Sequence, residues 1–146
     1  MLINEDGINL ITEFEGCKLT AYKCPAGIWT IGYGHTGPEV TECLQWTQEQ
    51  ADTALVKDLA KFNDGVAKLI RSEVNINQFS ALVCLAYNCG LTNLGKSTLL
   101  RKVNANPDDT TIKDEFVKWD RADGKTLPGL QRRRQAEAGL YFKATY

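Results

Sequence analysis

The stretch that decides the fold runs from Phe14 to Thr36 and reads FEGCKLTAYKCPAGIWTIGYGHT. Its acid, Glu15, stands where an amphipathic segment ends. The following residues are rich in β-branched and aromatic side chains, and a Pro-Ala-Gly turn interrupts them, which is typical of a hairpin. We therefore predict strands over residues 19–23 and 28–33, with the acid at the edge of a small sheet.

Two further polar side chains follow the acid within this stretch. Cys24 comes after eight intervening residues, and Thr30 comes after five more. Taken alone, Glu15 is most simply a solvated surface residue, but a hairpin that folds back beside it would create a partly apolar site. Such surroundings favour the neutral carboxyl, so that Glu15 can donate a proton near neutral pH. We predict that it acts as a general acid.

The rest of the chain reads as mostly helical. Apolar residues at helical spacing predict a helix over residues 3–14. Thr47-Gln48-Glu49-Gln50 matches a capping box and begins the longest predicted helix, over residues 48–70. A helix over 76–89 is apolar on nearly every side, which indicates a central position. Further helices are predicted over 97–103, 111–122 and 128–142, and a loop or short third strand over 37–46.

Composition excludes several classes of protein. The 146 residues are 43% hydrophobic and 24% charged, with a net charge of −1, which is typical of one folded domain. Lysine and arginine together are outnumbered by acids, 17 to 18, so a nucleic-acid partner is not expected. The start, MLINEDGINL, has neither a basic run nor a long apolar core. We therefore expect no signal peptide, no membrane insertion and synthesis in the cytoplasm.

The cysteines and the single histidine do not indicate a metal site. The odd number of cysteines lacks the paired spacing of zinc ligands, so reduced buried thiols are expected, with a bridge between Cys17 and Cys24 as the alternative. His35 is expected to be structural and hydrogen-bonded to a carboxylate or backbone group. The cysteines are Cys17, Cys24, Cys43, Cys84 and Cys89.

Five blocks of sequence, in order, resemble the phage-type lysozymes, glycoside hydrolase family 24. The first joins Glu15 and Thr30 to the run Ile31-Gly32-Tyr33-Gly34-His35-Thr36. The resemblance extends from Gly7 to Phe142. The other blocks are Asn77-Gln78-Phe79 to Ala81-Leu82, Tyr87-Asn88 with Gly90, Ser97 to Arg101, and Leu127 to Leu130 with Arg132, Arg133 and Glu137.

The resemblance implies an α+β, mainly helical lysozyme-like fold. A small N-terminal hairpin lobe, about residues 14–50, and a larger C-terminal helical lobe would flank a cleft. The connecting helix would span about 48–70, and the helical lobe about 71–146 together with the N-terminal helix 3–14. Residues 1–146 would then form a single catalytic domain.

The same resemblance implies hydrolysis of the β-1,4 bond between N-acetylmuramic acid and N-acetylglucosamine, without a cofactor or metal. Glu15 matches the residue that protonates the glycosidic oxygen, while an aspartate and a threonine of the family hold the attacking water. Here Cys24 stands in place of that aspartate. If Cys24 and Thr30 position water, the anomer inverts, and if a Cys24 thiolate attacks carbon, it is retained. A third reading makes Cys24 a bystander.

Other site residues are also implied by the resemblance. Tyr87 and Asn88 match a position that lines the sugar cleft, although Tyr87 can equally belong to the core. His35 would support the site. Either Arg132 or Arg133 would point toward Glu15.

The implied biology is that of an endolysin for host cell lysis. It would be a monomer acting on peptidoglycan, held in the host cytoplasm until a separate holin-like protein permeabilises the membrane, and then acting on the periplasmic cell wall. Two alternatives stay open: a lytic transglycosylase on the same substrate, and a wall-binding module whose site has decayed.

Overall fold

The computed structural model describes residues 1–122 and 124–145, except for the side chain of Ala122. In the described residues, one helix and a group of strands come first, a run of helices follows, and a further pair of strands precedes the last helix. The elements are α1 (Glu5–Glu15), β1 (Lys18–Lys23), β2 (Trp29–Gly32), β3 (His35–Thr36), α2 (Gln48–Leu69), α3 (Ile76–Cys89), α4 (Leu91–Gly95), α5 (Thr98–Ala105), α6 (Ile112–Val117), β4 (Arg121–Ala122), β5 (Lys125–Thr126) and α7 (Pro128–Tyr141).

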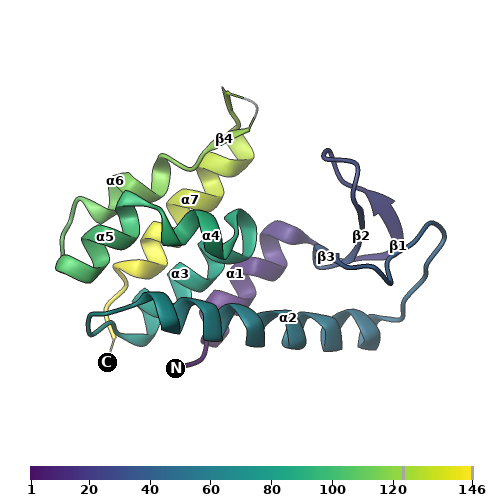
Figure 1. Ribbon diagram of the computed structural model, residues 1–146, viewed down its shortest axis with the longest axis horizontal. Coiled ribbons are helices and arrows are strands. Elements are labelled where there is room, and N and C mark those ends of the chain that lie inside the picture. The colour runs from purple at the N-terminus through teal and green to yellow at the C-terminus, as the bar shows by residue number, and fades with distance from the viewer. Residues whose placement is uncertain (123, 146) are drawn as a thin grey trace.

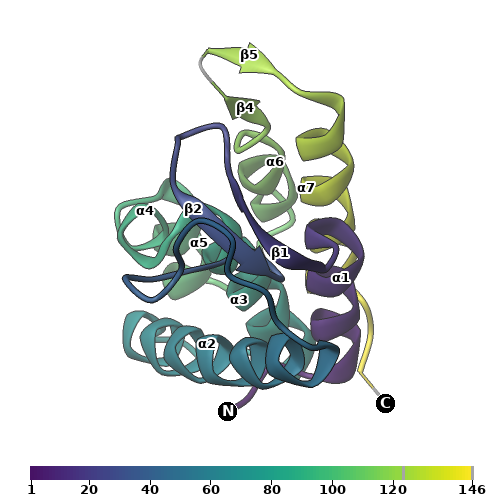
Figure 2. The ribbon, with the colours of Figure 1, turned by 90° about the vertical axis from the view of Figure 1, so that its right-hand side faces the viewer.

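Helix α2 runs along one side of the molecule, with the sheet β1–β3 at one end and most of the other helices at its other end (Figure 1). Helices α1 and α7 pack against each other and against α3 (Figure 2). The predicted α+β, mainly helical fold class is confirmed. The division into lobes stays a prediction.

Helix α3 lies at the centre of the helical region. Asn75 caps its first turn, and its apolar side chains from Phe79 to Ala86 are buried. Its neighbour α1 approaches closely at Gly7, where an added Cβ would lie 2.6 Å from Ile3 and 3.0 Å from Ser80. Close packing therefore explains a glycine that has poor helix propensity.

The sheet is antiparallel with the strand order β1-β2-β3, and Tyr22 of β1 pairs with Thr30 of β2. The predicted hairpin is therefore present. The third strand, β3, comes earlier than residues 37–46, which form a loop with one isolated bridge from Gln45 to Thr20.

The structure corrects the prediction for residues 111–122. Helix α6 ends at Val117, and the chain then forms β4, which pairs with β5. The expected helix stop at Asp123-Gly124 includes Asp123, which lies outside the described residues. Helix α4, directly after Gly90, was not predicted, because its five residues are too few to show a helical period.

All five cysteines are free, so the alternative bridge between Cys17 and Cys24 is absent. Only Cys84 is fully buried, and Cys43 is exposed. The expectation of buried thiols is therefore wrong for Cys43, which lies in the loop before α2. In the part of the chain that the structure describes, every helix is too short or too polar to cross a membrane.

Candidate active site

Glu15 is the last residue of α1, and its carboxyl is held from two sides. The Nη1 atom of Arg133 in α7 donates to Oε1 at 2.7 Å, and the side chain of Glu15 is only 19% exposed. On the other side the carboxyl lies against Gly34, where an added Cβ would be 2.8 Å from Oε2. Gly34 also has φ +79°, so glycine fits this turn on both counts. The carboxyl is thus fixed between α7 and the turn from β2 to β3.

Cys24 and Thr30 meet at the turn between β1 and β2. The backbone NH of Cys24 donates to the Ile28 carbonyl at 3.0 Å, and the Thr30 hydroxyl donates to the same oxygen at 3.0 Å. Hydrogen bonding with the Ile28 backbone, and then with Ala26 and Thr30, lowers the pKa of the Cys24 thiol, although partial burial acts in the opposite direction. The thiolate is therefore easier to form at Cys24 than in a free cysteine.

Tyr22 is a site residue that the sequence analysis missed. It stands opposite Thr30 across the β1–β2 pair, and Lys18 lies 4.8 Å from the centre of its ring. Burial, and then the nearby charges of Glu15 and Cys24, raise the pKa of Tyr22. Glu15 and Cys24 are thus both close enough to Tyr22 to act on its hydroxyl group.

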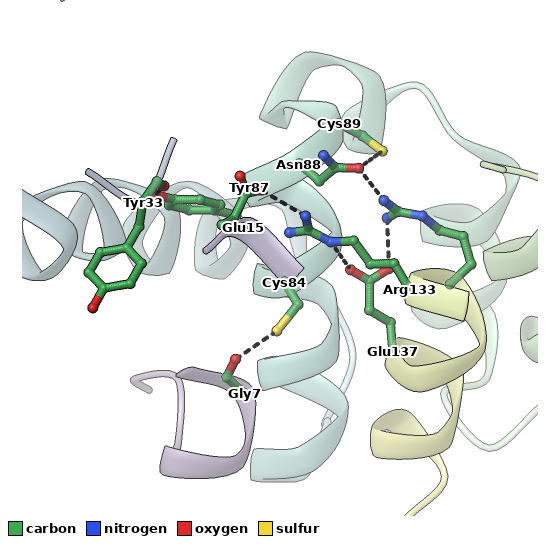
Figure 3. Close-up of polar contacts among 10 residues, drawn as sticks. Gly7, Glu15, Tyr33, Cys84, Tyr87, Asn88, Cys89, Arg133 and Glu137 are labelled. Carbon is green, nitrogen blue, oxygen red and sulfur yellow. Dashed lines mark hydrogen bonds and ion pairs between the residues drawn. The ribbon is translucent and has the colours of Figure 1, made fainter. Parts of the chain in front are cut away.

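Of the two candidate arginines, Arg133 makes the contact with Glu15, and Arg132 is exposed on the same helix. Arg133 also lies against Glu137, with 3.4 Å between its Nε and Oε2 (Figure 3). Its side chain is 5% exposed. The acid is therefore anchored by a buried cation and not by a surface one.

Tyr87 and Asn88 both lie at the end of α3, near the acid (Figure 3). The Tyr87 hydroxyl donates to the backbone oxygen of Tyr33, and its ring packs 5.2 Å from that of Phe62. Asn88 is exposed, and its Oδ1 accepts a hydrogen bond from Arg134. Tyr87 thus joins α3 to the sheet, while Asn88 faces solvent.

His35 joins the sheet to α2 through carboxylates. Its Nδ1 lies 2.7 Å from Asp58 Oδ2, and its Nε2 lies 2.5 Å from Glu39 Oε1. Burial acts to lower the pKa of His35, but the hydrogen bonds to Glu39 and Asp58 outweigh burial and raise it. Both ring nitrogens are engaged, which favours a structural role over a catalytic one.

Two large cavities lie away from this site. One, of about 490 Å³, is lined by His35, Trp46 and Lys57, and the other, of about 550 Å³, by Val117 and Phe142 among others. Neither is lined by the acid, the thiol or the hydroxyl described above.

Comparison with known proteins identifies similar chains along the whole length. A family model described as phage lysozyme matches residues 12–137. The endolysin of Bacillus phage B103 is 43% identical over 97% of this chain and 54% of its own, so the chain spans about half of that relative. The endolysin of Acyrthosiphon pisum secondary endosymbiont phage 1 is 42% identical over 99% of this chain and 100% of its own.

Among solved structures, the muramidase domain of SpmX from Asticaccaulis excentricus superimposes with a TM-score of 0.88. It is 35% identical and covers 97% of this chain and 98% of its own. The family match includes the hairpin with Cys24 and Thr30 as well as helix α7 up to Glu137. The resemblance and the enzyme class predicted from the sequence are thus confirmed: the chain belongs to the phage lysozyme family of glycoside hydrolases.

Proposed function

We propose that this protein is an endolysin muramidase that hydrolyses the β-1,4 bond between N-acetylmuramic acid and N-acetylglucosamine in peptidoglycan. The observation that carries the proposal is the carboxyl of Glu15, which is held by Arg133 and lies against Gly34 at the turn that follows β2, the strand that carries Thr30. A muramidase domain of the same fold supports the choice of bond.

In this proposal Glu15 is the general acid. The contacts with Arg133 and with the backbone at Gly34 hold its carboxyl in one orientation. The protonated carboxyl gives its proton to the glycosidic oxygen as the bond to the anomeric carbon breaks. A carboxyl that is already oriented loses no further freedom in this step.

Cys24 and Thr30 position the attacking water on the opposite face of the sugar. The lowered pKa of Cys24 favours a thiolate that can accept the water's proton. The buried Thr30 hydroxyl lies at the same turn, and because its own hydrogen is donated to Ile28, its oxygen can accept a hydrogen bond from the water. The products are a protonated thiol, an ionised Glu15 and an inverted reducing sugar.

In this proposal Asn88 contacts the sugar chain, and Tyr87 fixes the position of the sheet relative to α3. Asn88 is exposed at the end of α3, whereas the Tyr87 hydroxyl is already bonded to Tyr33. His35 supports the site by fixing the sheet to α2.

The proposed setting is host cell lysis. Proteins similar to this chain bear the name endolysin. We propose that the protein acts as a monomer, stays in the host cytoplasm until a holin-like protein permeabilises the membrane, and then cleaves the periplasmic cell wall.

Clearing of permeabilised Gram-negative cells tests the enzymatic role of Glu15. The variant Glu15→Gln should lose activity by about 100-fold or more, because a Gln side chain cannot donate the proton. Glu13→Gln, an exposed acid on the same helix, is the matched control and should clear cells as fast as wild type. If wild type clears the cells no faster than Glu15→Gln, the enzymatic role of Glu15 fails, and absence of clearing by both would support a decayed wall-binding module instead.

Mass spectrometry of the released muropeptides tests the reaction. Hydrolysis leaves reducing ends, whereas a lytic transglycosylase leaves anhydro-muramic ends. NMR of the first product anomer then separates water attack, which inverts, from thiolate attack, which retains.

A further inference from the structure

A buried carboxylate stands behind the general acid. Glu137 in α7 is 0% exposed and lies between two guanidinium groups of its own helix. Arg134 Nη1 donates to its Oε1 at 2.7 Å, and Arg133 Nε lies 3.4 Å from its Oε2. Both arginines are themselves buried, at 4% and 0% exposed. The proposed mechanism gives Glu137 no task.

Arg133 connects this carboxylate to the acid. Its Nη1 contacts Glu15 and its Nε contacts Glu137 (Figure 3). The cluster therefore contains two cations and two carboxylates, and its net charge is zero when both carboxylates are ionised. Within the described residues, Arg133 Nη2 and Arg134 Nε are buried without a protein acceptor. The two guanidinium groups thus have more buried donors than hydrogen-bond acceptors, and the loss of a carboxylate would leave further donors without a partner.

We propose that Glu137 is a positioning residue for the general acid: it neutralises the Arg133–Arg134 pair, so that Arg133 can orient Glu15 without holding it ionised. This inference rests on the proposed function of Glu15. It gives the buried cluster a part in the reaction in addition to its part in packing.

The physical reason is a conflict at the acid. A buried cation beside a carboxyl favours the ionised form, yet a general acid must carry a proton when substrate is bound. Removing the charge of Glu137 would leave two buried cations with Glu15 as their only carboxylate. Glu15 would then be held ionised more strongly. With Glu137 in place, Arg133 still orients Glu15, but part of the positive charge of Arg133 is neutralised by Glu137.

The titration of Glu137 determines where the effect should be visible. Burial raises the pKa of Glu137 to about 7, while Arg134 and Arg133 act to lower it. The charge of Glu137 acts on Cys84 and Cys89 of α3. Glu15 of α1 is linked to Glu137 through Arg133, which contacts both carboxylates. On α6, the buried Glu115 is bonded to Lys102 and Lys118. Glu137 is therefore ionised chiefly above about pH 7, and its effect on the cluster should be visible there.

The test is the pH profile of kcat in variants that change the charge of the cluster. In Glu137→Gln, which keeps an acceptor at the same place, the alkaline limb should move down by about one pH unit. In Arg134→Met, which removes a cation, the limb should move up. The double variant restores neutrality, so its limb should return close to that of wild type, and its fold does not depend on an unpaired buried charge.

The matched control is Glu115→Gln, which also removes a buried carboxylate with two cationic partners but lies away from Glu15. It should lower stability and leave the limb in place. An unmoved limb in Glu137→Gln or Arg134→Met, or a limb in the double variant that stays displaced, would overturn the proposal. KM should change little in Glu137→Gln, since no proposed substrate contact and no neighbour of one is removed.

A readout without activity separates this inference from the proposed function. The Glu15 carboxyl carbon can be titrated by NMR and assigned by its loss in Glu15→Gln. Its midpoint should move in the same directions as the limb. If wild type proves inactive on peptidoglycan, the proposed function fails, but the midpoint still decides whether Glu137 sets the ionisation of Glu15.

Discussion

The β1–β2 hairpin and helix α3 differ in almost every physical respect. Residues at the hairpin turn are exposed, including Ile28 at 53%, and Cys24 is partly open to solvent. Helix α3 is buried on nearly every side, with Leu82 at 0% exposed. The hairpin holds the reactive thiol and hydroxyl, whereas α3 contributes mainly packing. The proposed chemistry and the buried packing therefore lie in different parts of this small protein.

Glu15 lies between the two regions. It belongs to α1, which packs on α3, and its carboxyl lies against Gly34 in the turn that follows β2. In the proposed mechanism the helical frame fixes the proton donor, while the exposed hairpin meets the sugar chain. Substitutions in the two regions should consequently affect different measurements.

The largest expected effect on stability is in α3. Leu82→Ala should lower the free energy of unfolding by about 2–5 kcal/mol, because it removes a fully buried side chain and leaves a cavity. Activity per folded molecule should hardly change at a temperature where the variant is folded. Urea unfolding measures the loss. Leu19→Ala, in the hairpin at 38% exposed, is the control, and an equal loss there would remove the contrast between the regions.

The next expected effect is a loss of activity without a loss of stability, and it lies in the hairpin. Cys24→Ala should lose activity by roughly tenfold or more, because it removes the group that accepts the water's proton, while Cys24→Asp should keep it. Both variants should unfold close to wild type, since the position is partly exposed. Turnover at saturating substrate is the measurement. Full activity in Cys24→Ala would make the thiol a bystander and leave Glu15 to work almost alone.

A smaller effect is expected where β3 joins α2. Burial is the largest single influence on the pKa of His35 and lowers it. The hydrogen bonds to Glu39 and Asp58 together outweigh burial, so that the pKa of His35 lies above its unfolded value. Its contribution is therefore fully present below the unfolded pKa, about 6.5, and is lost as the pH rises through the folded value. The difference in unfolding free energy between wild type and His35→Asn should be about 1–3 kcal/mol near pH 5.5. Urea unfolding across the pH range should show it shrinking at alkaline pH, and growth with pH would contradict this sign.

Much of the frame could be predicted because its signals are local. The apolar run predicted α3, and the capping box at Thr47 predicted the start of α2 that the structure shows. The end of α6 could not be predicted in this way, since the pairing of β4 with β5 depends on the return of the chain and not on local pattern.

The site shows the same limit. The resemblance identified Glu15, Cys24 and Thr30 as candidates, and their roles stay predictions. It left open which arginine would reach the acid, because neighbouring residues on a helix point in different directions and only the packing of α7 selects Arg133. Glu137 stands four residues after Arg133, a helical spacing that signals an ion pair. Its complete burial, however, depends on α3 and is not visible in the sequence.

The smallest effect concerns the first turn of α2, on which the sheet rests. The Thr47 hydroxyl accepts from the Gln50 backbone NH at 3.2 Å, and the Gln50 side chain accepts from the Thr47 NH at 2.8 Å. Thr47→Ala should therefore cost about 1 kcal/mol of stability, with faster hydrogen exchange confined to that turn. Thr53→Ala, exposed within the same helix, lacks a capping role and should not weaken it. If both variants weaken the protein equally, the loss is not due to the cap. If exchange also rises in the hairpin, the two regions are coupled through α2 more tightly than the contrast between them implies.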